Sequence, residues 1–97
     1  MRFEVRFTRS ADGDLEHYRS YEQKLICDGV DWFLEVDADV ETRRRKQLRP
    51  NPLSPWELRL GKYRVFYEVR EGGLVRVLPV GHKVHGDLFI RGEKVEI

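Results

Sequence analysis

Apolar and polar residues alternate strictly over positions 1–8 of the chain, which predicts a strand with one face against a core. The spacing then becomes helical. Ser10 is a candidate N-cap, and Ala11, Leu15 and Tyr18 fall on one helical face. A second helical run follows, with an acidic outer face and an apolar face made of Ile26, Val30, Phe33 and Leu34. The first third of the chain therefore predicts a strand followed by a helical pair.

Residues 41–55 interrupt this periodicity, because a basic run is followed by Pro50, Pro52 and Pro55, which disfavour regular structure. From Trp56 onward the alternation returns as three strand patterns, separated by turns at residues 61–62 and 71–73. The last ten residues fit a short hairpin turning at residues 91–92. The whole chain, residues 1–97, is therefore predicted to be a single α+β domain. In it, a strand and two helices precede an antiparallel meander, and the helices cover one sheet face.

The turn lengths fix which residues oppose each other across the meander. The predicted registers pair Arg59 with Arg64, Glu57 with Phe66, Glu68 with Arg76, Arg64 with Val80 and Val65 with Pro79. Because side chains alternate between faces with a period of two, His82 is then expected on the same face as Arg64. The face away from the helices would collect Arg59, Arg64, Arg76 and His82, together with Glu57 and Glu68.

Clustered arginines beside an imidazole suit an anionic ligand, because arginine gives planar bidentate contacts to phosphate and histidine exchanges a proton near neutral pH. The alternative is a solvated antiparallel face with salt bridges at its rim. Phe66 lies on this face, where a base can stack. Trp56, Tyr63 and Tyr67 fall on the opposite parity and are expected in the core. His85 is either a second base or an exposed loop residue.

Charge is distributed unevenly along the chain, although the formal net charge is only +1. Residues 1–41 hold 5 basic and 11 acidic side chains, whereas residues 42–97 hold 13 basic and 6 acidic. Such an asymmetry between halves can mark a basic functional surface. The basic loop either tracks a phosphate backbone or complements a helix C-terminus. The residues expected to contact phosphate are Arg43, Arg44, Arg45, Lys46, Arg49, Arg59, Lys62 and Arg76.

Several other classes of protein do not fit the composition. No apolar stretch reaches the ~20 residues of a membrane helix, and residues 1–8 do not resemble a signal peptide. The chain has one cysteine, Cys27, and its three histidines lack the spacing of a zinc site. There is no glycine-rich phosphate loop. A cytoplasmic domain without a metal or cofactor is expected.

Two motifs in the basic half resemble those of a known family. Leu-Arg-x-Gly-x-Tyr-Arg-Val-x-Tyr spans residues 58–67, and a strand ending in Val-Gly-His-Lys spans residues 75–83. In these motifs, and in its order of elements, the chain resembles the RelE/ParE superfamily of toxins from toxin–antitoxin systems. The resemblance implies a curved antiparallel sheet with a helical pair on one side, and a small antitoxin that masks the basic face. It leaves the oligomeric state open.

The two branches of this superfamily imply different activities. The RelE branch, which we favour, implies a ribosome-dependent and metal-independent endoribonuclease, in which the 2′-hydroxyl of the messenger RNA attacks the adjacent phosphate. The resemblance then makes Arg64 a phosphate-binding residue and His82 a general acid or base. Lys83 is a further phosphate contact, and Glu57 is a candidate base. The ParE branch implies inhibition of DNA gyrase without cleavage, and a catalytically inert antitoxin-binding homologue is the other alternative.

The chain departs from the RelE pattern at two places. Pro55 and Glu57 stand where that branch has lysines, and Phe89 stands where it has a tyrosine near the C-terminus. These departures favour the ParE or inert alternatives, whereas His82 favours the endoribonuclease.

Overall fold

The computed structural model describes residues 2–97, so Met1, the first position of the predicted strand, lies outside the described residues. The elements are β1 (Glu4–Phe7), α1 (Arg9–Leu15), α2 (Ser20–Leu34), β2 (Arg45–Gln47), β3 (Trp56–Leu60), β4 (Tyr63–Arg70), β5 (Leu74–Val84), β6 (Asp87–Ile90) and β7 (Glu93–Val95). Their order confirms the predicted α+β class. None of the helices within residues 2–97 combines the length and apolarity that a membrane span requires.

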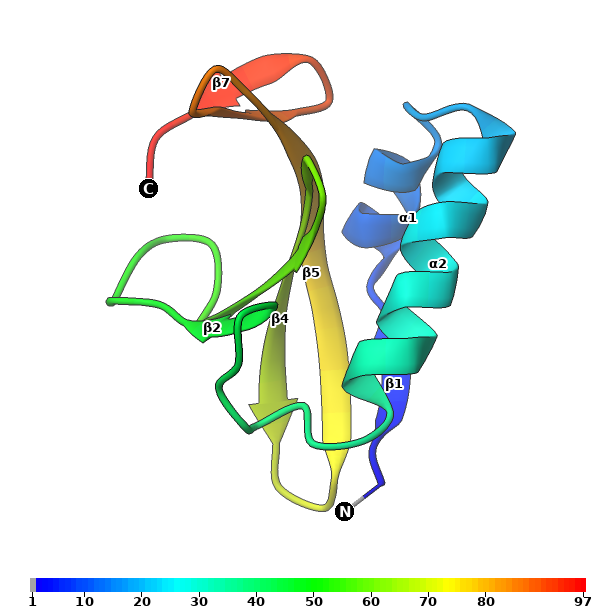
Figure 1. Ribbon diagram of the computed structural model, residues 1–97, viewed down its shortest axis with the longest axis vertical. Coiled ribbons are helices and arrows are strands. Elements are labelled where there is room, and N and C mark those ends of the chain that lie inside the picture. Colours follow the sequence, from blue (N-terminus) through cyan, green and yellow to red (C-terminus); the bar gives the residue numbers. More distant parts are fainter. Residues whose placement is uncertain (1) are drawn as a thin grey trace.

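One curved sheet organises the molecule, and the helical pair lies along one of its faces (Figure 1). The strands follow the order β2-β3-β4-β5-β6-β7, each antiparallel to the next. β1 lies parallel to the first part of β5, while β6 pairs with the last part of the same strand. The long β5 therefore forms the centre of the sheet, with β4 on one side and β1 and β6 on the other.

The core lies between the sheet and the two helices. Ile26, Val30 and Leu34 of α2 are fully buried, and the predicted core aromatics Trp56, Tyr63 and Tyr67 are buried opposite them. Gly29 permits this close approach, because a Cβ atom there would lie 2.6 Å from Leu60 Cδ1. A residue that weakens an isolated helix thus serves helix–sheet packing here.

Two local predictions were wrong. The N-cap of α1 is Thr8 and not Ser10: the Thr8 hydroxyl accepts a hydrogen bond from the Ala11 amide at 3.1 Å, which satisfies a free N–H of the first turn. The basic loop also contains a short strand, β2, which pairs with β3 and was not predicted. Three residues of charged sequence carry no alternation of hydrophobicity, so only pairing with β3 reveals the strand.

The register between β4 and β5 departs from the prediction at Pro79. Glu68 opposes Arg76 as expected, but Val65 opposes Val80 and Arg64 opposes Gly81. Two residues of β5, Leu78 and Pro79, therefore face the single residue Phe66, which is a β-bulge. Proline cannot donate to a ladder hydrogen bond, so a bulge at this position is physically reasonable.

The face away from the helices is partly covered. The loop of residues 48–55 lies on that side of the sheet (Figure 1). Phe66 faces the same side, opposite Glu57, and is fully buried. The prediction that Phe66 is available to stack on a base is therefore wrong, because its ring belongs to the interior.

Candidate functional site

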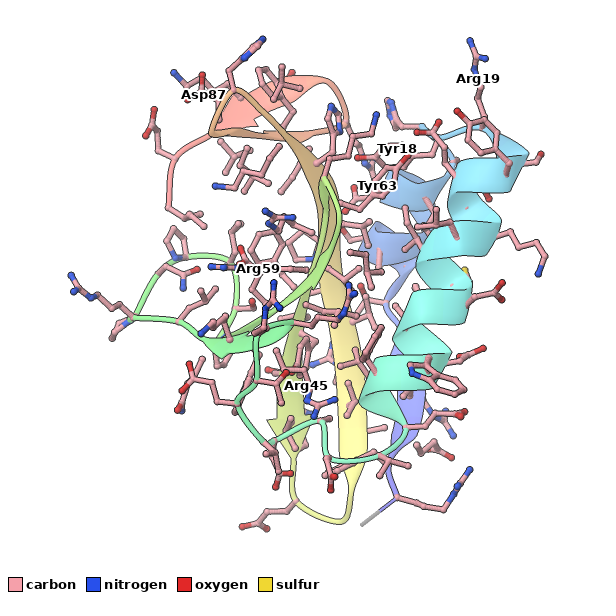
Figure 2. All side chains as sticks on the ribbon, in the orientation of Figure 1. Tyr18, Arg19, Arg45, Arg59, Tyr63 and Asp87 are labelled. Carbon is pink, nitrogen blue, oxygen red and sulfur yellow. The ribbon has the colours of Figure 1, made fainter. Side chains whose placement is uncertain are left out.

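A groove on the sheet face away from the helices contains four of the predicted site residues. It is lined by Glu57, Arg59, Arg64 and Lys83, with Leu48, Gly86 and Ile97 completing the walls. We call it the Arg64 groove. Figure 2 shows Arg59 on this side of the sheet, whereas Tyr18 and Tyr63 lie between the sheet and the helices. Three cationic side chains and one carboxylate therefore meet in one depression.

Arg64 is more enclosed than the neighbouring Arg59, whose side chain is 46% exposed. The Arg64 side chain is 16% exposed, and one of its terminal nitrogens donates to the carbonyls of Gly61 at 2.6 Å and Tyr63 at 2.9 Å. Its Nε is buried and, among the described residues, has no hydrogen-bond partner. Burial lowers the pKa of Arg64 from its ordinary value, with Arg59 adding to this and Glu57 opposing it. A buried donor without an acceptor is uncommon in folded proteins.

Among the described residues that line the groove, Glu57 is the one with a carboxylate side chain. It is 3% exposed, and its Oε1 accepts a hydrogen bond from Arg59 Nε at 2.7 Å and lies 4.0 Å from Arg64 Nε. The directly opposed pair Arg59 and Arg64 would repel each other, and Glu57 lies close to both. The carboxylate is thereby fixed in orientation beside two guanidinium groups.

The bulge changes the sheet faces of His82 and Lys83, the two residues that end the second motif. Because Arg64 opposes Gly81, the next residue His82 opposes Tyr63 and shares its face, towards the helices. The expected position of His82 on the arginine face is therefore wrong. Lys83 points into the groove instead, where its Nζ lies 3.4 Å from the Gly86 carbonyl.

His82 belongs to a polar cluster behind the sheet. Its Nδ1 lies 2.7 Å from the Tyr18 hydroxyl, and its ring stacks on Phe89 with centroids 5.9 Å apart. Tyr63 donates its hydroxyl to Glu22, whose carboxylate also accepts from the Arg19 amide at the start of α2. Burial lowers the pKa of His82, aided by Lys62 and opposed by Glu22. Burial, with Glu22 and Asp14, raises the pKa of Tyr18 to about 12. This cluster joins α2 to β4 and β5.

The basic loop divides into residues with different roles. Arg45 donates to the carbonyls of Phe33 and Val40, both at 2.9 Å, and so ties β2 to the end of α2. Arg44 lies 5.0 Å above the Phe33 ring, yet together with Arg43 and Arg59 it lines a second depression beside the groove. Lys46 opposes Glu57 across the β2–β3 pair, and Arg49 is exposed. Arg45 thus complements the C-terminal end of α2, and the contact of the other loop cations with a phosphate backbone stays a prediction.

Arg76 and Lys62 lie outside the Arg64 groove lining. Arg76 donates to Glu68 at 2.9 Å, which confirms the predicted pair, but it lines another depression with Arg6, Arg9 and Arg70. The Lys62 ammonium lies 5.4 Å from the centre of the Tyr63 ring. The predicted face is therefore divided into two separate basic clusters.

One residue that positions the site was not predicted. Asp14 of α1 is 2% exposed and accepts from the Val80 amide at 2.9 Å and from Arg91 Nε at 2.6 Å. It satisfies the amide that follows the bulge and so holds the β5 path that places Lys83 in the groove. Pro79 within a strand pattern was the available signal of a bulge, but nothing in the sequence indicated Asp14 as its partner.

Comparisons with known proteins agree with this architecture. Residues 5–84 match the family model described as the ParE toxin of the type II toxin–antitoxin system parDE. Among solved structures, the chain is similar to one in the crystal structure of the toxin–antitoxin complex RelBE2 from Mycobacterium tuberculosis. The two share 24% identity with a TM-score of 0.69, over 86% of this chain and 100% of that one. No curated protein matches the chain.

The family match covers residues 5–84, and the structural similarity covers 86% of the chain. The predicted resemblance to the RelE/ParE superfamily is thereby confirmed. The chain belongs to the ParE toxin family of type II toxin–antitoxin systems.

Proposed function

We propose that this toxin is a metal-independent endoribonuclease that cleaves messenger RNA on the ribosome and uses the Arg64 groove as its active site. The observation that carries the proposal is a groove in which the cations of Arg59, Arg64 and Lys83 meet beside the carboxylate of Glu57. A phosphate of RNA suits these cations, because charge-assisted hydrogen bonds between guanidinium and phosphate are strong and directional.

The groove residues suggest a division of labour. Glu57, oriented by Arg59, removes the proton from the 2′-hydroxyl, whose oxygen attacks the adjacent phosphorus. Arg64 and Lys83 stabilise the additional negative charge on the phosphate oxygens in the transition state. The bond to the 5′-oxygen of the next nucleotide breaks, and that oxygen takes a proton from Lys83 or water. The products are a 2′,3′-cyclic phosphate and a 5′-hydroxyl.

This division replaces His82 as the proposed general acid, because its ring contacts Tyr18 and Phe89 behind the sheet. We propose that His82 supports the sheet and that the chemistry depends on Glu57, Arg64 and Lys83. The cognate antitoxin of this system is proposed to cover the groove. The similarity to a toxin–antitoxin complex supports the existence of such a partner.

Inhibition of DNA gyrase is the second candidate function. Two observations favour it: the matching family model is that of ParE, and neither histidine nor tyrosine occurs in the groove lining. In that case the same cations would contact the target without any bond being broken.

A parallel assay separates the two functions. The purified toxin is added to a translation extract, where messenger RNA cleavage is mapped, and to a gyrase supercoiling reaction. We expect cleavage in the extract and unchanged supercoiling. Arg64→Ala should reduce cleavage by about 10²–10³-fold, as removal of one transition-state donor does. Arg70→Ala, outside the groove, is the matched control. Loss of supercoiling with intact messenger RNA would establish the second candidate instead.

A further inference from the structure

The outer face of α2 carries a stripe of exposed apolar side chains. Tyr21, Leu25 and Trp32 are 67%, 48% and 80% exposed, and Val36, just beyond the helix, is 40% exposed. Within the helix, the spacings of four and seven residues place Tyr21, Leu25 and Trp32 along one line, opposite the buried face. Val36 lies beyond the helix end, where it forms an isolated bridge with Arg2. In Figure 1, α2 forms the outer edge of the molecule, with α1 and the sheet on its inner side. We call this line the α2 stripe.

Isolated exposed apolar residues are ordinary, but an aligned set is not. Contiguous apolar patches on soluble proteins mark interaction sites, and tryptophan and tyrosine are enriched among the residues that dominate binding energy. Trp32 is the most exposed of the large hydrophobic residues in the described chain. The fold does not need its ring, because the core is closed by the opposite face of α2.

The charges beside the stripe indicate what covers it. Asp28 lies within the line, and Asp31 and Glu35 follow along one edge. The cation of this edge, Lys24, is paired with Asp28 at 2.9 Å, and both side chains are well exposed. Exposed pairs of this kind contribute little, so Asp28 can exchange its partner at low cost. The stripe is therefore apolar in the middle and acidic at the margin.

We propose that the α2 stripe docks a basic amphipathic helix of a partner protein. A helix with an apolar line flanked by lysine or arginine would cover Trp32 and Leu25 and neutralise the acidic edge at the same time. A second copy of this chain fits less well, because antiparallel two-fold pairing along α2 would bring the two acidic edges together. The stripe lies on the side of the helices away from the sheet, so its occupant leaves the Arg64 groove free. The inference does not rest on the proposed endoribonuclease activity.

The test uses the full chain and a defined probe. The probe is a fluorescently labelled helical peptide, about as long as α2, with leucine at the heptad a and d positions and lysine at the flanks. A second peptide carries glutamate in place of each lysine. Fluorescence anisotropy titrations should show the basic peptide binding at least about tenfold more tightly than the acidic one. Trp32→Ala should weaken binding by a similar factor without changing the thermal midpoint. Val84→Ala, at an exposed apolar residue of β5, should leave the affinity unchanged.

Charge reversal makes the test decisive. The double variant Asp28→Lys and Asp31→Lys should now prefer the acidic peptide over the basic one. The proposal is overturned if neither peptide binds, if both bind equally, or if the preference survives the reversal. It is also overturned if sedimentation shows a wild-type dimer that Trp32→Ala dissociates, because the occupant is then a second copy.

Discussion

The two faces of the sheet place similar polar groups in opposite environments. Behind the sheet, Tyr63 donates to Glu22, the Tyr18 hydroxyl lies 2.7 Å from His82 Nδ1, and the rings of Tyr18 and Tyr63 pack edge to face. In front of it, the Arg64 groove keeps Arg64 Nε buried without an acceptor and places like charges directly opposite each other. A satisfied network contributes to the fold, whereas an unsatisfied one is free to bind a ligand.

This difference shows why residue type alone is a poor guide to the site. A histidine is the usual proton-transfer residue, yet His82 is committed to packing and hydrogen bonding. The lysine beside it is the residue that faces the groove. Whether a polar side chain already has partners within the protein therefore separates a packing role from a ligand-binding role better than its chemical type does.

The largest expected effect comes from exchanging one polar group on each face for glutamine. If Glu57 is the base, Glu57→Gln should lower the rate of messenger RNA cleavage by about 10²–10⁴-fold. His82→Gln should change the rate per folded molecule little, because its ring lies behind the sheet. Cleavage is followed by primer extension in a translation extract, and the folded fraction is determined by circular dichroism.

The reverse result would reassign the site. If a fully folded His82→Gln variant is inactive and the Glu57→Gln variant is active, the catalytic residues lie on the sheet face that packs against the helices.

Breaking the connection between the faces should affect stability next most strongly. Asp14→Ala leaves the Val80 amide without its acceptor, and a buried unsatisfied donor costs about 1–3 kcal/mol of unfolding free energy. Asp14→Asn is the matched control: its side-chain oxygen can still accept from the Val80 amide, and no unpaired buried carboxylate is left, so it should cost less. Urea unfolding followed by tryptophan fluorescence measures both. Equal losses in the two variants would contradict the role given to the bulge.

The helix face should also make stability depend on pH. The pKa of His82 is lowered in the folded state, so the unfolded chain binds its proton first as the pH falls below its ordinary pKa of about 6.5. The stabilising contribution is therefore complete above about pH 6.5 and is lost as the pH falls towards the lower folded value. His82→Phe should reduce this slope in urea titrations between about pH 7.5 and about pH 5.5. An identical slope in the wild type and the variant would show that other groups cause the dependence.

The smallest effect is expected at the far end of the groove face. Arg76→Ala removes the ion pair with Glu68 at 2.9 Å, and a partly exposed pair is worth ~0–1 kcal/mol. Cleavage activity should stay close to that of the wild type, because Arg76 does not line the Arg64 groove. A loss of activity as large as that of Arg64→Ala would mean that the two basic clusters act on one ligand.

Much of the fold could be predicted because its signals are local. Alternation identified β3, β4 and β5, and the Gly61-Lys62 turn gave the register that sets Arg59 opposite Arg64. The glycine at residue 61 has a φ of +59°, which a tight hairpin turn requires. The Arg91-Gly92 turn of the C-terminal hairpin was likewise predictable.

The misplaced parts of the site depend on contacts between distant segments. Counting by twos along β5 gave the wrong face for His82, because the extra residue at Pro79 is stabilised by Asp14, 65 positions earlier in the chain. Phe66 was misjudged because the loop of residues 48–55 lies over its side of the sheet, and no periodicity describes that loop. β2 was missed because its pairing with β3, and not its own composition, makes it a strand.

The bulge at Pro79 acts as a one-residue insertion in β5. Two residues of β5 face Phe66 there, and beyond them His82 opposes Tyr63 while Lys83 lines the groove. Removing one residue at the bulge would make the ladder regular and leave Val80 opposite Val65 and His82 opposite Tyr63. Both side chains would keep their faces. A single deletion at this position therefore removes the irregularity of the strand and leaves the chemistry of both surfaces in place.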